Sequence, residues 1–278
     1  MVAAPVLWST AGVVTRHVER AGAFEQVFWR SLFAFLFVFA FLILKTNPWK
    51  AIRAAGWPGL VSGLMWAVMF TAFMFALSMT TTANALVVMS VSPLLTAICA
   101  RLFLSDLVPP RTWIAASAAA VGIAWMFSSS LENHLGGMAV ALLIPIAAAI
   151  NVVVLRASAA KLDLIPAVML GGAISCLLAL PFAFPFSLSA KDFSLLAFLG
   201  VFQLGLPCML LVIASRTLPA PEIALLGLLE VVLGPLWAWL GAGERPAGAT
   251  LAGGMVVLAA LALNEIGGLR RSTQPQVR

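Results

Sequence analysis

Long apolar segments recur along the whole chain and are separated by short polar stretches. A helix needs about 20 mostly apolar residues to cross the hydrocarbon core of a bilayer. The pattern therefore predicts ten transmembrane helices, at residues 2–15, 24–44, 57–79, 81–104, 110–127, 136–156, 164–184, 193–214, 219–240 and 246–266. The first segment is shorter than the others, so we expect either a shallow position in the bilayer or a chain start upstream of Met1.

Composition agrees with a membrane protein built from helices. Hydrophobic residues make up 63% of the chain and charged residues 9%, whereas soluble domains carry about 25% charged residues. A single signal peptide does not explain the pattern, because the apolar segments are not confined to the N-terminus. We therefore predict an all-α, multi-pass membrane protein that is surrounded by the lipid bilayer.

The basic residues are divided unevenly between the loops of the two predicted membrane faces. Eleven Lys and Arg residues fall on the face that carries both termini, and four fall on the opposite face. Loops rich in Lys and Arg stay in the cytoplasm, which predicts an N-in and C-in topology in a bacterial-type inner membrane. This asymmetry accounts for the net charge of +6, so no nucleic-acid partner is needed.

Residues 81–109 correspond without a gap to residues 219–247, at an offset of 138, which pairs Ser92 with Glu230. Ten spans divide into two halves of five. An odd number of spans per half inverts the second half relative to the first, as in many secondary transporters. We predict a first repeat at residues 1–130, a connector at 131–135, an inverted second repeat at 136–270 and a cytoplasmic tail at 271–278.

Glu230 is the acidic residue nearest the middle of a predicted span. A charge at that depth costs about 2.5 to 3.5 kcal/mol unless it is paired, protonated or exposed to water. Its carboxylate is a candidate for binding a substrate ammonium group and for proton coupling, and the alternative is a hydrogen bond that fixes helix packing. Helical spacing places Trp237 on the same face of the ninth span. The repeat places Asn84 and Ser92 on the matching face of the fourth.

Further polar and aromatic residues complete the set of candidates. Asn151 and Gln203 can bind a ligand or hydrogen-bond a neighbouring helix. Trp8 and Trp237 can line a cavity or pack in the core. The residues that we expect to bind substrate are Glu230, Ser92, Trp8, Asn84, Asn151, Gln203 and Trp237. Proline frees a backbone carbonyl within a helix, so we expect bends at Pro93, Pro145, Pro207 and Pro235.

Arg30 is the second ionisable residue within a span. It lies near the non-cytoplasmic end of its helix, so we expect the long side chain to extend to the interface. A salt bridge between Arg30 and Glu230 is the alternative. The predicted depths of the two residues in the bilayer do not favour it. The fifth and tenth spans are rich in small residues, which allow helices to approach closely, either within one chain or in a homodimer.

The residues that an enzyme or a metal site would need are sparse. Cys99, Cys176 and Cys208 lie in apolar segments without the spacing of metal ligands, and His17 and His134 lie in predicted loops. We therefore predict no catalytic residue, no metal site and no cofactor.

Short motifs stand out in and after the first, second and ninth predicted spans: Leu7-Trp8-Ser9-Thr10, Phe28-Trp29-Arg30, and Leu229-Glu230-Val231 followed by Gly243-Glu244-Arg245. These motifs resemble those of the EamA-type transporters of the drug/metabolite transporter superfamily. That family usually has Gly where this chain has Ser9 and Pro where it has Val231. The resemblance covers essentially the whole chain. It implies two inverted five-helix repeats around a central cavity, lined mainly by spans 1, 3, 4, 6, 8 and 9, and alternating access.

The same resemblance implies export of amino acids, other small metabolites or drugs, and the opening motif is most similar to the aromatic amino acid exporter branch. A sugar-phosphate carrier needs cationic groups deep in its cavity, whereas no Lys lies at the centre of a predicted span and Arg30 is predicted to lie near a helix end. A largely apolar cavity with Trp, Met and one acid fits an amino acid or an amphiphilic cation better. We therefore hypothesise a small-molecule transporter that exports amino acids, aromatic ones included. A multidrug or cationic metabolite exporter is the alternative. A channel and a membrane-embedded enzyme are the alternatives of another class.

Overall fold

The computed structural model describes residues 1–15, 17–80, 82–105, 107–126, 135–242 and 248–272. Helices joined by short loops make up this part of the chain, and no strand occurs in it. The all-α fold class is therefore confirmed. Most of the predicted connector and tail lies outside these residues. The elements are α1 (Ala3–Trp8), α2 (Ala11–Thr15), α3 (Ala23–Lys45), α4 (Pro48–Met79), α5 (Thr82–Met89), α6 (Ser92–Phe103), α7 (Pro110–Met126), α8 (Leu135–Ser158), α9 (Ile165–Ala183), α10 (Ala190–Phe198), the π-helix η1 (Leu199–Gly205), α11 (Leu206–Ala214), α12 (Ala220–Gly227), α13 (Leu229–Ala242) and α14 (Gly248–Ser272).

Seven helical segments of the described chain are long and apolar enough to cross a membrane. They are Ala23–Lys45, Pro48–Ala76, Ala85–Phe103, Gly136–Ser158, Ile165–Ala183, Ala190–Ala214 and Ala220–Gly241. Two further apolar helical segments, Ala3–Thr15 and Leu251–Asn264, are shorter. The chain is therefore a multi-pass membrane protein, and seven of the ten predicted spans meet the length and hydropathy that a crossing requires.

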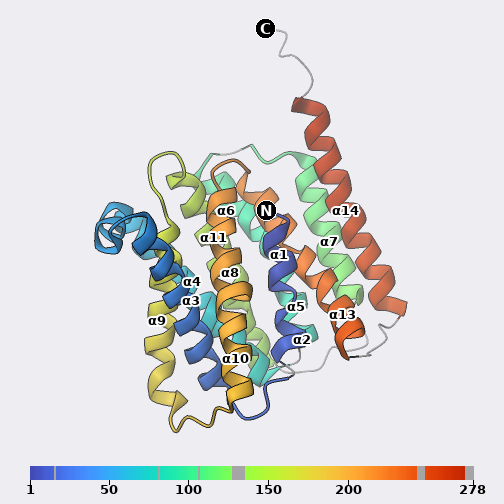
Figure 1. Cartoon of the computed structure of the whole chain (residues 1–278). Helices are drawn as coiled ribbons and strands as arrows, with labels where there is room; N and C mark the ends of the chain where they lie inside the picture. The colour runs from blue at the N-terminus through green and yellow to red at the C-terminus, as the bar shows by residue number, and fades with distance from the viewer. Residues whose placement is uncertain (16, 81, 106, 127–134, 243–247, 273–278) are drawn as a thin grey trace.

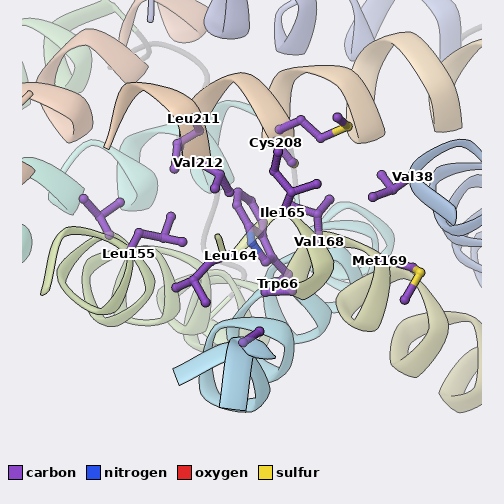
Figure 2. Close-up of a cluster of buried hydrophobic side chains, with 14 of the residues drawn as sticks. Val38, Trp66, Leu155, Leu164, Ile165, Val168, Met169, Cys208, Leu211 and Val212 are labelled. Atoms are coloured by element: carbon purple, nitrogen blue, oxygen red, sulfur yellow. The ribbon is translucent and has the colours of Figure 1, made fainter. Parts of the chain in front are cut away.

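α3, α4, α8 and α9 pack together on one side of the bundle (Figure 1). Glycine permits the closest of these approaches: a Cβ on Gly171 of α9 would lie 2.4 Å from the Trp66 Cβ of α4. Trp66 belongs to a buried apolar cluster that also contains Leu155, Val168 and Cys208 (Figure 2). This cluster joins helices of both halves of the chain into one core.

α7 and α14 lie side by side at the opposite edge of the bundle (Figure 1). A Cβ on Gly122 would lie 3.0 Å from the Gly253 carbonyl oxygen, so the backbones touch where the residues are smallest. The Thr112 hydroxyl donates to Asn264 Oδ1 at 3.0 Å in the same contact. The small-residue faces of the fifth and tenth spans are therefore used within one chain.

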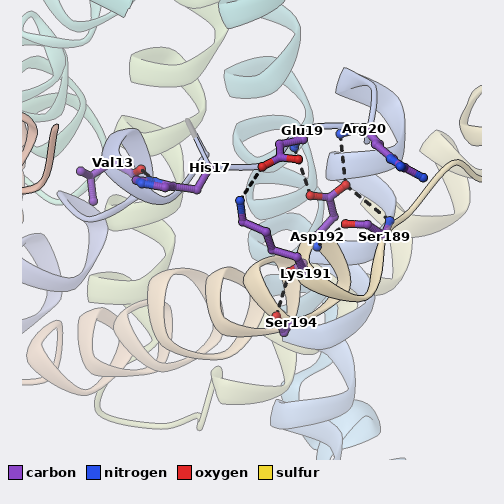
Figure 3. A network of polar contacts seen from close by, with 8 residues as sticks. All are labelled: Val13, His17, Glu19, Arg20, Ser189, Lys191, Asp192 and Ser194. Carbon is purple, nitrogen blue, oxygen red and sulfur yellow. Dashed lines mark hydrogen bonds and ion pairs between the residues drawn. The ribbon is translucent and has the colours of Figure 1, made fainter.

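A polar network joins the α2–α3 connection to the start of α10 (Figure 3). Asp192 has no exposed surface. Its carboxylate accepts the Glu19 backbone N–H at 3.0 Å and the Arg20 backbone N–H at 3.1 Å. With Ser189 it also forms a capping box at the first turn of α10. These bonds satisfy a buried carboxylate and hold the first and second halves together at one end of the bundle.

Candidate functional site

The fourth and ninth predicted spans are each divided into two half-helices. The fourth is interrupted at residues 90–91, between α5 and α6, and the ninth at Leu228, between α12 and α13. Ser90 and Leu228 are 138 residues apart, which is the offset of the internal repeat. Ser92 therefore becomes the first residue of α6, and Glu230 the second residue of α13.

The fourth span is interrupted where proline would be expected to interrupt it. Pro93 lies in the first turn of α6 and has no N–H to donate to the preceding turn. The backbone N–H of Ser90 is shared between the carbonyls of Leu86 and Val87, at 3.0 and 3.2 Å. The helix thus tightens at its end before it restarts at Ser92.

The ninth span is interrupted without proline at the break. Leu228 N–H donates to the Leu225 carbonyl at 3.1 Å, and Val231 N–H donates to the Leu228 carbonyl at 3.0 Å. Both bonds span three residues, as in a 3₁₀ turn, which is often found at a functional hinge. Pro235, where we expected a bend, lies inside α13, and its side chain is outside the described residues.

Glu230 is half-buried and makes no hydrogen bond or ion pair with any described residue. Two turns further along α13, the Trp237 indole N–H donates to the Ser9 hydroxyl at 2.8 Å. Between them, a Cβ on Gly234 would have no described atom within 4 Å. The face of α13 that carries Glu230 therefore borders open space and reaches the junction of α1 and α2.

The α1–α2 junction also contacts the π-helical segment of the eighth span. The Gln203 side-chain amide donates to the Trp8 carbonyl at 3.5 Å. Gln203 is buried, and its Oε1 has no hydrogen-bond partner among the described residues. A π-helix widens the helical turn and is frequently found at functional sites. Pro207, another expected bend, follows this segment in the first turn of α11.

Cys208 connects these groups to a second charge. It lies in the apolar cluster against which Trp8 packs, and within electrostatic range of both Arg30 and Glu230. The prediction that Arg30 extends to the interface is wrong, because only 2% of its surface is exposed. α3 is packed against α9 and η1 at this level, so the guanidinium is enclosed by protein.

The sequence candidates separate into two groups. Trp8, Gln203, Trp237 and Glu230 all lie around the α1–α2 junction. The others do not join this group. Asn151 accepts a hydrogen bond from the buried Ser62 hydroxyl at 2.6 Å, and Pro145 lies inside the continuous α8. Ser92 is half-buried at the start of α6, and the Asn84 side chain falls outside the described residues.

Three residues of this constellation were not among the sequence candidates. Arg30 could have been chosen, because an ionisable residue within a span is a functional candidate by default. Ser9 occupies the position where the related motif usually has glycine, and this difference is a weak indication that its side chain has a functional role. Cys208 offers no signal, because a cysteine in an apolar segment resembles any small buried hydrophobe.

A pocket of about 320 Å³ lies away from this site, lined by Leu104, Arg156, Ala159, Ala160 and Arg216. Both arginines already have partners. Arg156 Nη1 donates to the carbonyls of Ser215 and Arg216 at 3.3 and 3.1 Å. Arg216 pairs with Asp163 at 3.0 Å. The α1–α2 junction is therefore the candidate functional site.

Comparisons with known proteins agree with a transport fold. One solved structure, titled "Crystal structure of protein", superimposes with a TM-score of 0.83 over 98% of this chain and 96% of the other, at 17% sequence identity. That similarity shows the fold alone. No curated protein matches the chain. The profile of the EamA-like transporter family matches residues 1–128 and 135–265. The chain therefore belongs to the EamA-like transporter family, which is a family of membrane transporters and not of enzymes.

Proposed function

We propose that the protein exports amino acids, aromatic ones included, by alternating access across a bacterial-type inner membrane, with Glu230 in the substrate path. One observation carries this proposal: Glu230 has no hydrogen-bond or ion-pair partner among the described residues, although it lies near the start of α13, which packs against α1 and α2, and within electrostatic range of Cys208. Interrupted helices at the interface of inverted repeats commonly form the substrate sites of secondary transporters.

The helix contacts support the inverted duplication. If the halves are equivalent, spans 2 and 7, 4 and 9, and 5 and 10 should pair with each other. α3 packs on α9, α6 on α12 and α7 on α14. A contact between two spans that are not equivalent should also occur a second time, between their counterparts in the other half. α8 packs on α4 and α6, and its counterpart α1 packs on α11 and α13. With α1 counted as part of the first span, this arrangement supports ten spans, and an even number of spans would place both termini on the same side of the membrane.

The chemistry of the site supports a zwitterionic or cationic substrate with an apolar body. Trp8 and Trp237 supply aromatic surface, and Glu230 supplies one negative charge. An amino acid with an apolar side chain meets both features, through its ammonium group and its side chain. A cationic drug or metabolite meets them as well, and it is therefore the second candidate.

Counterflow in proteoliposomes tests the proposed function. Purified protein should exchange labelled phenylalanine or tryptophan saturably with unlabelled amino acid, and less with purines, polyamines or quaternary ammonium drugs. Ion conductance without saturable exchange would instead identify a channel. For the direction, cells fed phenylalanine-containing dipeptides should release the amino acid faster when they express the protein. Exchange of polyamines or drugs but not of amino acids would replace this proposal with the second candidate.

Filling the open space beside Glu230 should block transport without unfolding the protein. In Gly234→Phe the new ring enters a region where a Cβ meets no described atom within 4 Å. We expect counterflow to fall at least about tenfold, because an obstructed site loses well over one kcal/mol of substrate binding. The unfolding temperature should stay close to that of the unmodified protein. Gly248→Phe is the matched control, since Gly248 is exposed and its surroundings are also open. Normal transport by Gly234→Phe would place the substrate path elsewhere.

A further inference from the structure

Arg30 is a buried cation without an adequate partner. Its side chain is 2% exposed, and Nε and Nη1 have no hydrogen-bond partner among the described residues. The guanidinium carbon lies 6.0 Å from the centroid of the Phe73 ring, at the outer limit of a cation–π contact. A buried charge that is not paired costs several kcal/mol, so proteins rarely keep one without a ligand or a counterion.

The other unpartnered groups of the site complement Arg30. Gln203 Oε1 is a buried acceptor without a partner among the described residues, and Glu230 is an acid without one there. Cys208 lies within electrostatic range of both Arg30 and Glu230, and Gln203 is joined to the same region through the Trp8 carbonyl. Around Cys208 and Trp8 the chain thus has both donors and acceptors that lack a partner among the described residues. An α-amino acid presents the opposite pattern, with a carboxylate that accepts and an ammonium group that donates.

We infer that Arg30 binds the carboxylate of the transported amino acid, while the ammonium group faces Glu230 and Gln203. This inference rests on the proposed function and adds the orientation of the substrate to it. The planar guanidinium fork suits a carboxylate. The carboxylate is a better fit than a phosphate dianion, because an α-amino acid also carries an ammonium group that the acid Glu230 can bind, whereas a phosphate dianion carries none.

Three probes that share one phenyl ring test the inference by binding alone. L-phenylalanine carries both charged groups, phenethylamine lacks the carboxylate and 3-phenylpropionate lacks the ammonium group. Their affinities can be measured from the rise in unfolding temperature of the purified protein. For the unmodified protein we expect phenylalanine to bind at least about tenfold more tightly than phenethylamine, because a charge-assisted hydrogen bond is worth that much or more.

Arg30→Gln should remove this advantage. We expect the affinities for phenylalanine and 3-phenylpropionate to fall at least about tenfold, and that for phenethylamine to stay the same. Arg30→Lys keeps the charge but loses the fork, so it should give an intermediate loss for the two carboxylates. Arg101→Gln is the matched control, because Arg101 is exposed at the end of α6, and it should change none of the three affinities.

The outcomes separate this inference from the proposed function. Equal losses for all three probes in Arg30→Gln would mean that Arg30 supports the fold or Glu230, and would overturn the inference. If Arg30→Gln does not fold, equal binding of phenylalanine and phenethylamine by the unmodified protein would overturn it as well. Carboxylate binding that depends on Arg30, without amino acid counterflow, would support Arg30 as the carboxylate-binding residue and would overturn the proposed function.

Discussion

Replacing Glu230 with glutamine is expected to lower amino acid counterflow about a hundredfold. The side chains have nearly the same shape, so the substitution removes the charge and little else. A hydrogen bond to a charged group is worth about 1.5 to 3 kcal/mol, and a hundredfold loss corresponds to about 2.7 kcal/mol. No described residue makes a hydrogen bond or ion pair with the carboxylate. The loss would therefore report on the substrate or a proton, because no described packing bond is broken.

The measurement is the initial rate of labelled phenylalanine exchange in proteoliposomes with equal amounts of reconstituted protein. Glu19→Gln is the matched control, because Glu19 is exposed in the connection between α2 and α3. Its rate should equal that of the unmodified protein. Unchanged exchange by Glu230→Gln at every pH tested would remove both the binding role and the proton role from Glu230.

The same variant separates proton coupling from facilitated diffusion. A pH-sensitive dye inside the vesicles should report proton movement when substrate is added to the unmodified protein, if Glu230 exchanges a proton for substrate. Glu230→Gln should then lose the dye signal together with any pH dependence of the rate. Substrate flux without proton movement in the unmodified protein would leave Glu230 a binding role only.

Hydrophobic patterning predicted the helical class and most of the spans, because a bilayer requires long apolar helices wherever a chain crosses it. Small residues in the fifth and tenth spans predicted a close helix contact, which α7 and α14 make. The pattern did not predict how the helices are interrupted. Leu228 has α-region dihedral angles, φ −63° and ψ −12°, and the one glycine beside it, Gly227, is a weak signal among the many glycines of these helices.

The candidate site was only partly predictable for a related reason. Glu230, Trp8, Gln203 and Trp237 carry chemistry that is visible in a sequence, whereas the burial of Arg30 depends on its neighbours. Arg30 is near a helix end by its position in the chain, and the packing of α9 and η1 against α3 encloses it. The position of an arginine along its span cannot distinguish an interfacial side chain from an enclosed one, because the adjacent helices determine whether it is covered.

Adding one methyl group at Gly200 is expected to destabilise the protein strongly. Gly200 lies in η1, where the π-helical segment crosses α3. A Cβ there would lie 2.4 Å from the Phe33 Cβ and 2.6 Å from the Arg30 carbonyl oxygen. Neither contact can be relieved by rotating a flexible side chain, because one atom is a backbone carbonyl oxygen of α3 and the other is a Cβ, which is fixed to that backbone. The two helices must move apart in Gly200→Ala.

Overpacking of this kind costs about 1 to 3 kcal/mol and occasionally more, and we expect the upper end because two rigid contacts are violated. For a chain of this size, about 3 kcal/mol corresponds to a fall of about 6 to 12 °C in unfolding temperature. Gly227→Ala is the matched control in a helix of the ninth span, where a Cβ has no described atom within 4 Å, and its unfolding temperature should not fall. An unfolding temperature for Gly200→Ala equal to that of Gly227→Ala would contradict the close α3–η1 contact that encloses Arg30. Since η1 also carries Gln203, Gly200→Ala should weaken phenylalanine binding even in the fraction that remains folded.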